Sequence, residues 1–301
     1  MRILIVGAGA TGGAFGARLQ ECGRDVTYLV RPERAAHLRA HGLTFVAPDG
    51  TRTFPVRAVT AAELAGPFDV VIVAVKSGGL PAVLDDIAPA VGEGTVVIPF
   101  LNGLAHVDQL RERYGDRVLG GLVRIVATLR DGQVVQLHPL ATMTVGALDA
   151  SSVPLLAPVL DALDVPGFEL IVSDDVLGAL WEKWAFIVAA GVVTCLFRNT
   201  VGNIVAAGGE PQVRAAIEET ERVAAAAGHP VGRTAHEQSV GLLTQPGSAF
   251  TSSLYRDVVA GNPNETEHLL GDYAARARAL AVPVPTLDLT LVQLRAGALG
   301  S

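Results

Sequence analysis

Short runs of branched apolar residues alternate with helical patterns through the first part of the chain. The runs 3–6, 25–30, 70–75 and 95–98 are each followed by glycine or polar residues. Strands that read as continuous apolar runs between helices are typical of a parallel sheet covered on both faces. The pattern therefore predicts an α/β domain at the N-terminal end.

The pattern changes after residue 118. Three further runs are predicted to form a meander added at the edge of the sheet: 123–129, 134–137 and 142–145. Asp131-Gly132 supplies a turn signal between the first two of them. A last strand is expected at 169–172, directly before a pair of aspartates.

Nothing after these aspartates has the pattern of a strand. Asp174 and Asp175 can cap a long helix that runs through Lys183 into the apolar run 184–197. This run is shorter than the ~18 to 20 residues that a membrane span needs, so we interpret it as a buried helix. The other helices expected in this part are 211–227, 253–261, 265–280 and 285–299. The second domain is therefore predicted to be all-helical.

Composition narrows the possible partners and compartments. The chain has 301 residues and a net charge of −7, which argues against a nucleic-acid partner or an anionic membrane surface. Two cysteines, Cys22 and Cys195, are too few for a disulfide framework and lack the spacing of a zinc site. The N-terminus lacks the apolar core of a signal peptide. We expect a cytoplasmic protein without a metal site.

A glycine-rich segment follows the first apolar run at once and opens a helical stretch. Its residues are Gly7, Ala8, Gly9, Ala10, Thr11 and Gly12. The first glycine permits a tight turn, the second lets a pyrophosphate approach the backbone, and the third allows close packing of helix and strand. A glycine-rich surface turn is the alternative. We predict a Rossmann-like dinucleotide-binding domain at 1–173 and a helical domain for substrate and dimerisation at 174–301.

The residue after the second strand indicates the form of the cofactor. NAD enzymes usually have an acidic residue here to hold the ribose 2′-hydroxyl, whereas this chain has Arg31. Arg31, with Arg34 one turn on, suits a 2′-phosphate, so NADP(H) is favoured over NAD(H). A solvated arginine is the alternative interpretation.

Only two of the 23 basic residues are lysines, Lys76 and Lys183. Unlike arginine, lysine can exchange a proton when its surroundings lower its pKa. Lys76 follows a strand at the edge where open α/β sheets bind ligands, and Asn102 follows the next strand at the same edge. These residues are candidates for chemistry, against the alternatives of surface lysines and an ordinary Asn-Gly turn.

With these residues the sequence resembles the ketopantoate reductases, which are cytoplasmic NADPH enzymes of pantothenate synthesis with a Rossmann domain and a helical C-terminal domain. The resemblance covers nearly the whole chain. It rests on Gly7–Gly12, Arg31, Val75-Lys76-Ser77, Asn102-Gly103, Leu180-Trp181-Glu182-Lys183, Thr251-Ser252-Ser253 with Asp257, and Asn264-Glu265.

The resemblance implies a role for each matching residue. Lys183 matches the general acid that protonates the ketone oxygen while NADPH delivers hydride to the carbon. Lys76 and Asn102 match residues that line the nicotinamide and the substrate. Ser253 matches a hydroxyl that binds the carboxylate side of the substrate, and Glu265 matches the acidic residue that organises the site and the cofactor.

The sequence also departs from the family pattern. Ile187, Gly191 and Leu270 stand where family members commonly carry polar residues that bind substrate oxygens. The leading hypothesis is reduction of 2-dehydropantoate to pantoate. The alternatives are an NADP-dependent reductase of a different, more apolar 2-oxo acid and a non-catalytic NADP(H)-sensing protein. Apolar faces on the C-terminal helices make a homodimer plausible.

Overall fold

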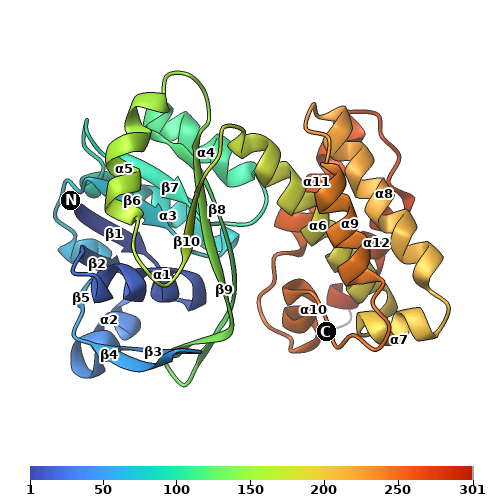
Figure 1. The fold of residues 1–301 in the computed structure, drawn as a ribbon, viewed down its shortest axis with the longest axis horizontal. Helices are drawn as coiled ribbons and strands as arrows, with labels where there is room; N and C mark the ends of the chain where they lie inside the picture. The colour runs from blue at the N-terminus through green and yellow to red at the C-terminus, as the bar shows by residue number, and fades with distance from the viewer. Residues whose placement is uncertain (300–301) are drawn as a thin grey trace. The chain divides into compact units, whose positions relative to one another are not determined.

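The computed structural model describes residues 1–299, and the chain divides into two compact units. Unit 1 comprises residues 1–102 and 106–176, and unit 2 comprises residues 103–105 and the chain from 177 onward. Figure 1 labels the helices and strands of both. Each unit is described by itself.

Unit 1 contains a five-stranded sheet in the order β5-β2-β1-β6-β7, with every neighbouring pair parallel. Its strands are β1 (Arg2–Val6), β2 (Asp25–Leu29), β5 (Arg57–Val59), β6 (Val70–Val73) and β7 (Val96–Pro99). The helices that follow them are α1 (Ala10–Glu21), α2 (Pro32–His41), α3 (Leu80–Asp86) and α4 (Ala105–Tyr114). All four residues of β6 and of β7 are buried, as expected for strands covered on both faces. The predicted Rossmann-like parallel sheet is confirmed.

A second sheet contradicts the prediction of a meander at the edge of the first. It has the order β10-β9-β3-β4, and β8 pairs with β9. Its strands are β3 (Leu43–Ala47), β4 (Gly50–Phe54), β8 (Leu119–Arg130), β9 (Gln133–Ala147) and β10 (Glu169–Val172). The sequence analysis missed β3, β4 and β5, because these strands are short and β4 is a solvated hairpin arm of Thr and Arg without an apolar run.

Helix α1 packs between the two sheets, and three of its glycines permit this. A Cβ atom on Gly13 would lie 2.5 Å from a methyl group of Val134 in β9. One on Gly16 would lie 2.6 Å from Ile5 in β1 and 2.4 Å from the Tyr28 hydroxyl in β2. Gly12 is equally confined and belongs to the functional site described below. The glycine-lined side of α1 therefore allows the helix and the two sheets to pack closely in unit 1. Helix α5 (Leu156–Leu163) packs against β9.

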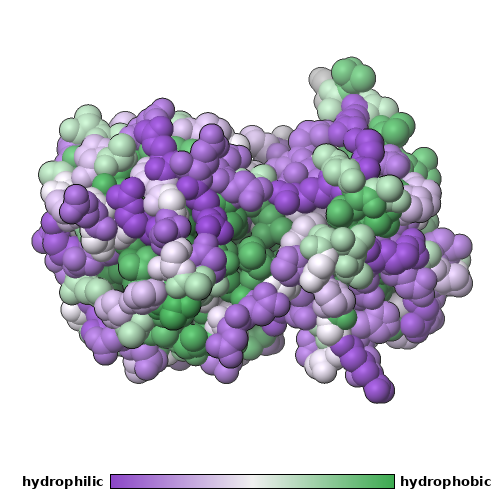
Figure 2. Space-filling view, turned by 90° about the horizontal axis from the view of Figure 1, so that it is seen from above, coloured by the Kyte–Doolittle hydropathy of each residue, from purple (hydrophilic) through white to green (hydrophobic). Residues whose placement is uncertain are grey.

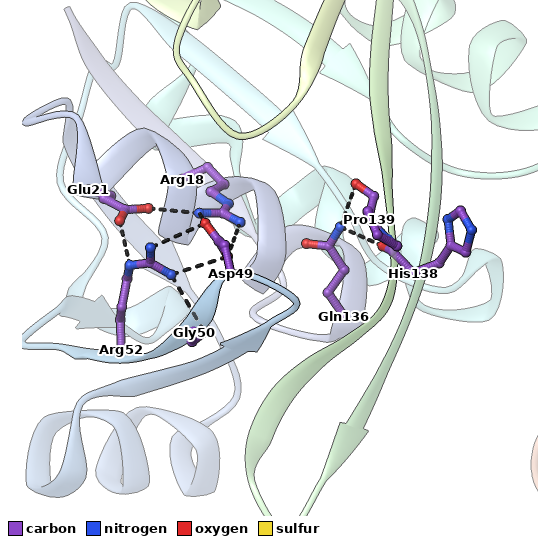
Figure 3. A network of polar contacts seen from close by, with 8 residues as sticks. All are labelled: Arg18, Glu21, Asp49, Gly50, Arg52, Gln136, His138 and Pro139. Carbon is purple, nitrogen blue, oxygen red and sulfur yellow. Dashed lines mark hydrogen bonds and ion pairs between the residues drawn. The ribbon is translucent and has the colours of Figure 1, made fainter.

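Strand β9 contains an irregularity that explains why its sequence reads as two separate strands. Ile125 pairs with Ala141 and Ala127 pairs with Gln136, so one residue of β8 faces four residues of β9. The buried Gln136 amide closes this bulge by donating hydrogen bonds to the carbonyls of His138 (2.8 Å) and Pro139 (3.3 Å), as Figure 3 shows. The bulge interrupts the alternation that a regular strand would show.

An ion-pair network joins α1 to the β3–β4 hairpin (Figure 3). The Arg18 guanidinium, with its side chain 9% exposed, lies 2.8 Å from Asp49 and 3.1 Å from Glu21. Arg52 contacts the same two carboxylates. The hydrogen bond from Arg18 holds the pKa of Asp49 well below its usual range.

Unit 2 is helical, as predicted. Its helices are α6 (Val176–Phe197), α7 (Val201–Ala206), α8 (Glu210–Ala226), α9 (Arg233–Leu243), α10 (Ser253–Val259), α11 (Asp272–Ala279) and α12 (Pro285–Leu299). The helix predicted at 265–280 is a π-helical turn, Glu267–Gly271, followed by α11. Helices α7 and α9 were not predicted.

Helix α6 is long and apolar enough to cross a membrane by length and composition alone. However, 61% of its most apolar window is buried inside the structure, including the fully covered Trp184 and Val188. Such burial is typical of the core helix of a folded protein. The interpretation of this segment as a buried helix therefore agrees with the structure.

A buried carboxylate caps a helix at a distance in unit 2. Glu219 of α8 is 3% exposed and accepts hydrogen bonds from the backbone N–H groups of Thr286 (3.1 Å) and Leu287 (2.9 Å) in the first turn of α12. These N–H groups have no acceptor within their own helix. Glu219 therefore fixes the start of α12 against α8.

Replacing Glu219 with alanine is expected to lower the free energy of unfolding by about 2 kcal/mol, because two donors lose a shared acceptor that also favours the helix dipole. Urea denaturation would measure the loss. Glu219→Gln keeps one carbonyl oxygen and should lose less. Alanine at the neighbouring, exposed Glu218 is the control, and an equal loss there would contradict the capping role.

Candidate functional site

Four candidate residues follow four adjacent strands of the parallel sheet in unit 1. Gly7 follows β1, Arg31 follows β2, Lys76 follows β6 and Asn102 follows β7. Because these strands are parallel, all four residues lie toward the carboxyl edge of the sheet. The chain leaves β1 toward β2 on one side and later returns to β6 on the other, and ligands of open α/β sheets bind at such a switch point.

The glycine loop between β1 and α1 has room for a phosphate group. Gly7 has φ +99°, and a Cβ atom on it would lie 2.8 Å from the carbonyl oxygen of Ala74. A Cβ atom on Gly12 would lie 2.1 Å from the carbonyl oxygen of Gly7, so no other residue fits there without a shift of backbone. A Cβ atom on Gly9, by contrast, would meet nothing within 4 Å. This open side of the loop fits the close approach of a pyrophosphate.

The start of α1 adds hydrogen-bond donors to the loop. Gly9 is the N-cap residue, and the N–H group of Gly13 makes a bond of 2.9 Å to the carbonyl of Gly9. The N–H groups of Ala10, Thr11 and Gly12 precede this bond and have no acceptor within the helix. A helix N-terminus with such donors favours an anion. The loop therefore fits the phosphates of a dinucleotide.

Two arginines near this loop differ in their surroundings. Arg31, the N-cap residue of α2, is exposed. Arg34, in the first turn of α2, is half-buried and donates hydrogen bonds from Nη1 to the carbonyl of Gly132 (2.8 Å) and from Nη2 to the carbonyl of Ala8 (3.2 Å). Only Arg31 is thus presented to solvent in the way that recognition of a 2′-phosphate requires.

Lys76 and Asn102 begin the connections that leave the sheet. Lys76 is exposed and is the N-cap residue of a short 3₁₀ turn ahead of α3. Asn102 is half-buried after the buried Phe100 and Leu101. The N–H group of Phe100 bonds to the carbonyl of Val73 at 2.8 Å, which extends the ladder between β6 and β7 toward Asn102.

Lys183 lies on α6 in unit 2 and is half-buried. The flanking rings of Trp181 and Trp184 are 5.3 Å apart, and Tyr273 packs edge-on against Trp184 at 4.7 Å. The Trp184 indole N–H donates a hydrogen bond of 3.1 Å to the carbonyl of Leu269 within the π-helical turn. No sequence pattern signals this link, and the sequence analysis missed it.

Two further candidates in unit 2 lie on segments tied to α6. Ser253, the first residue of α10, is exposed, while the preceding Ser252 is buried, caps the helix and lies 2.8 Å from the Thr194 hydroxyl of α6. Glu265 is half-buried, and its carbonyl accepts a hydrogen bond of 2.8 Å from the N–H group of Leu269 in the π-helical turn. Through these bonds the segments that carry Ser253 and Glu265 are fixed against the helix that carries Lys183.

The face of α6 that continues from Lys183 is apolar. Ile187 follows one turn later and is half-buried. Gly191 is buried, and a Cβ atom on it would lie 3.3 Å from a methyl group of Leu270 and 3.5 Å from one of Leu254. Gly191 and the buried Leu270 therefore adjoin each other, and Ile187 lies one helical turn before Gly191 on α6, so all three positions where polar residues were noted as missing are apolar.

A glycine loop at the switch point of a parallel sheet, followed along the chain by a helical unit with a half-buried lysine, defines a dinucleotide-binding α/β protein. The model of the family "Ketopantoate reductase PanE/ApbA" matches residues 3–150, and the model of its C-terminal domain matches residues 175–298. The chain belongs to the ketopantoate reductase PanE/ApbA family, so it is an oxidoreductase. The predicted family and the predicted nicotinamide cofactor are confirmed.

Individual relatives span nearly the whole chain. An uncharacterised oxidoreductase of Bacillus subtilis is 33% identical and a 2-dehydropantoate 2-reductase of Mesorhizobium japonicum is 25% identical, each over 98% of this chain and at least 97% of its own length. The crystal structure of a 2-dehydropantoate 2-reductase from Geobacter metallireducens has a TM-score of 0.87 at 26% identity and covers 99% of this chain and 100% of its own. A ternary structure of D-mandelate dehydrogenase with NADH and anilino(oxo)acetate has a TM-score of 0.88 at 19% identity, with 98% of each chain covered, which shows a shared fold.

Proposed function

We propose that this protein reduces the ketone of a branched 2-oxo acid with NADPH, and that 2-dehydropantoate is the leading candidate substrate. The observation that carries the proposal is that Lys183, one of only two lysines, is half-buried on α6, the helix on which Trp181 and Trp184 pack against each other. Family membership favours an enzyme over the non-catalytic sensor considered above.

Lys183 acts as the general acid in this proposal. NADPH, when bound, supplies the hydride that adds to the ketone carbon. The addition places negative charge on the ketone oxygen, and a nearby ammonium group stabilises this charge and then donates its proton to give the alcohol. Ser253 contributes a hydroxyl for the carboxylate side of the substrate, and Glu265 organises the site. Lys76 and Asn102 line the nicotinamide and substrate region from unit 1.

The preference for NADPH over NADH rests on Arg31. Its position after β2 is where NAD enzymes place an acidic residue, and its side chain is exposed at the start of α2. A guanidinium group there can form charge-assisted hydrogen bonds with a 2′-phosphate. The glycine loop, residues 7–12, holds the pyrophosphate whichever form is bound.

A second candidate substrate is a 2-oxo acid with a more apolar side chain. Ile187, Gly191 and Leu270 carry no side-chain hydrogen-bond donor for a substrate hydroxyl. A buried hydroxyl without a partner weakens binding, whereas a methyl group gains from burial. The related D-mandelate dehydrogenase, whose structure contains an anilino derivative of an oxo acid, also supports a test of aromatic 2-oxo acids.

A matched pair of substrates distinguishes the two candidates. 2-Dehydropantoate and 3,3-dimethyl-2-oxobutanoate differ by a single hydroxyl group, and kcat/KM for each is measured from NADPH oxidation, with phenylglyoxylate as an aromatic third. If 2-dehydropantoate is the substrate, we expect its kcat/KM to be larger by about 100-fold or more, because the site must then bind the hydroxyl. Equal or reversed values support the apolar candidate. No turnover with any of the three would contradict the proposed reaction.

We extend the proposal to a cytoplasmic homodimer. Both cysteines are free, as in a reducing compartment. Large apolar side chains reach the surface on α12, where Leu289 is 58% and Val292 is 62% exposed, and Figure 2 shows other hydrophobic residues between hydrophilic ones on the molecular surface. A relative from Staphylococcus aureus is described as dimeric.

A further inference from the structure

Arg34 connects two parts of unit 1 that are far apart in the sequence. Its Nη2 donates to the carbonyl of Ala8 inside the glycine loop, and its Nη1 donates to the carbonyl of Gly132 in the turn between β8 and β9. The two carbonyls are thus held by one planar group. A rigid guanidinium fork suits such bridging, because its donors keep a fixed geometry.

The β8–β9 turn is built closely against this part of the molecule. Gly132 has φ +77°, and a Cβ atom on it would lie 2.8 Å from Nε2 of His37 in α2. Two residues further along β9, a Val134 methyl group occupies the space beside Gly13 of α1. The β8–β9 hairpin therefore contacts α2 through its turn and α1 through Val134 of β9, and Arg34 completes the connection to the glycine loop itself.

The surroundings of Arg34 distinguish it from a surface residue. Its Nε is buried without a hydrogen-bond acceptor, and no carboxylate pairs with it among residues 1–299. Burial lowers the pKa of Arg34, although a guanidinium stays protonated. Such a half-buried cation without an acidic partner adds positive potential beside a loop that fits phosphates.

Arg34 was considered above as a second ligand of the 2′-phosphate. The structure instead directs one donor nitrogen to each of two backbone carbonyls, whereas the Arg31 side chain has no hydrogen bond with the described residues. We propose that Arg34 is a positioning residue, which fixes the glycine loop to the β8–β9 turn and so supports the binding of either dinucleotide, while Arg31 discriminates between them. This inference rests on the nicotinamide cofactor and is independent of the proposed substrate.

The test compares alanine at the two arginines by dissociation constants. Kd values for NADPH and NADH are measured by isothermal titration calorimetry on the wild type, Arg34→Ala and Arg31→Ala, without any oxo acid. Arg34→Ala is expected to raise both Kd values by similar factors of about 10. Arg31→Ala is expected to raise Kd for NADPH by at least 10-fold and to change Kd for NADH by less than twofold. A selective loss of NADPH in Arg34→Ala, or unchanged Kd values for both, would overturn the proposal.

A lysine variant of Arg34 and a hydrogen-exchange measurement distinguish a positioning role of the Arg34 side chain from a role of its charge alone. Lysine keeps the charge but cannot bridge two carbonyls as a fork does, so Arg34→Lys should bind both dinucleotides as weakly as Arg34→Ala. Recovery of NADPH binding by lysine would instead indicate a phosphate ligand and would refute positioning. Hydrogen exchange of the unliganded protein should become faster at residues 7–13 and 131–134 in both variants and stay as in the wild type in Arg31→Ala. If wild type binds neither dinucleotide, the cofactor assignment itself fails, which is a distinct result.

Discussion

Replacing Lys183 with alanine is expected to lower kcat for the preferred 2-oxo acid by about 10³-fold, within the range that a positioned general acid contributes. Kd for NADPH should change by less than twofold, because the glycine loop and Arg31 belong to unit 1 and Lys183 to unit 2. Rapid mixing of enzyme, NADPH and oxo acid would measure the rate of the chemical step. Full turnover in this variant would refute the assignment of the acid.

Two controls sharpen this experiment. Lys183→Arg keeps a positive charge but cannot release a proton near neutral pH, so it should remain nearly as slow as the alanine variant if proton donation matters. If charge alone were sufficient, the arginine variant would recover most of the activity. Alanine at Arg222, an exposed cation of α8, removes a charge elsewhere in unit 2 and is expected to leave kcat unchanged.

Replacing Gly12 with alanine is expected to abolish nucleotide binding and to lower the free energy of unfolding by about 3 kcal/mol. The new Cβ atom would lie 2.1 Å from the backbone oxygen of Gly7, so the loop itself must move. Alanine inside a helix ordinarily gains up to about 1 kcal/mol over glycine, which makes a net loss diagnostic of this overlap. Denaturant unfolding and fluorescence titration with NADPH measure the two effects.

The control for Gly12 is its neighbour Gly9. A Cβ atom on Gly9 meets nothing within 4 Å, so Gly9→Ala should unfold at nearly the wild-type denaturant concentration. Its methyl group projects into the open side of the loop, and NADPH binding should therefore weaken by about 10-fold or more. A Gly12 variant as stable as the Gly9 variant would show that the loop can accommodate the side chain.

The sequence predicted the strands that bury both faces and the elements with strong end signals. Runs such as 70–75 are too short for a typical helix and are rich in β-branched residues, which favours a strand, and the glycine-rich segment marks the end of β1. Strand β4 was missed because its own residues do not alternate between apolar and polar. It is paired with β3, and the pattern of a single segment does not reveal its pairing partner. The bulge at Gln136 divided β9 into two predicted strands for a similar reason.

The sequence predicted which residues belong to the candidate site, but it did not predict the hydrogen bonds that hold their segments in place. The sequence indicated Lys183 and Glu265 through composition and resemblance. Trp184 donates a hydrogen bond to a backbone carbonyl of the π-helical turn, and Arg34 donates two to other backbone carbonyls. Every residue has a backbone carbonyl, so the sequence does not indicate which of them accepts these bonds. Such links depend on tertiary packing, so they become visible only in the structure.

The placement of α1 between two sheets restricts how this segment can change in evolution. Every substitution of a glycine adds at least a Cβ atom, and Gly16 would bring that atom to 2.4 Å from the Tyr28 hydroxyl. That hydroxyl is buried without a hydrogen-bond partner among the described residues, so its loss to phenylalanine has little cost, but the same Cβ atom would still lie 2.8 Å from a ring carbon of residue 28 and 2.6 Å from Ile5. Position 16 is therefore expected to accept alanine in relatives only where positions 5 and 28 both carry smaller side chains, so these three positions should change together.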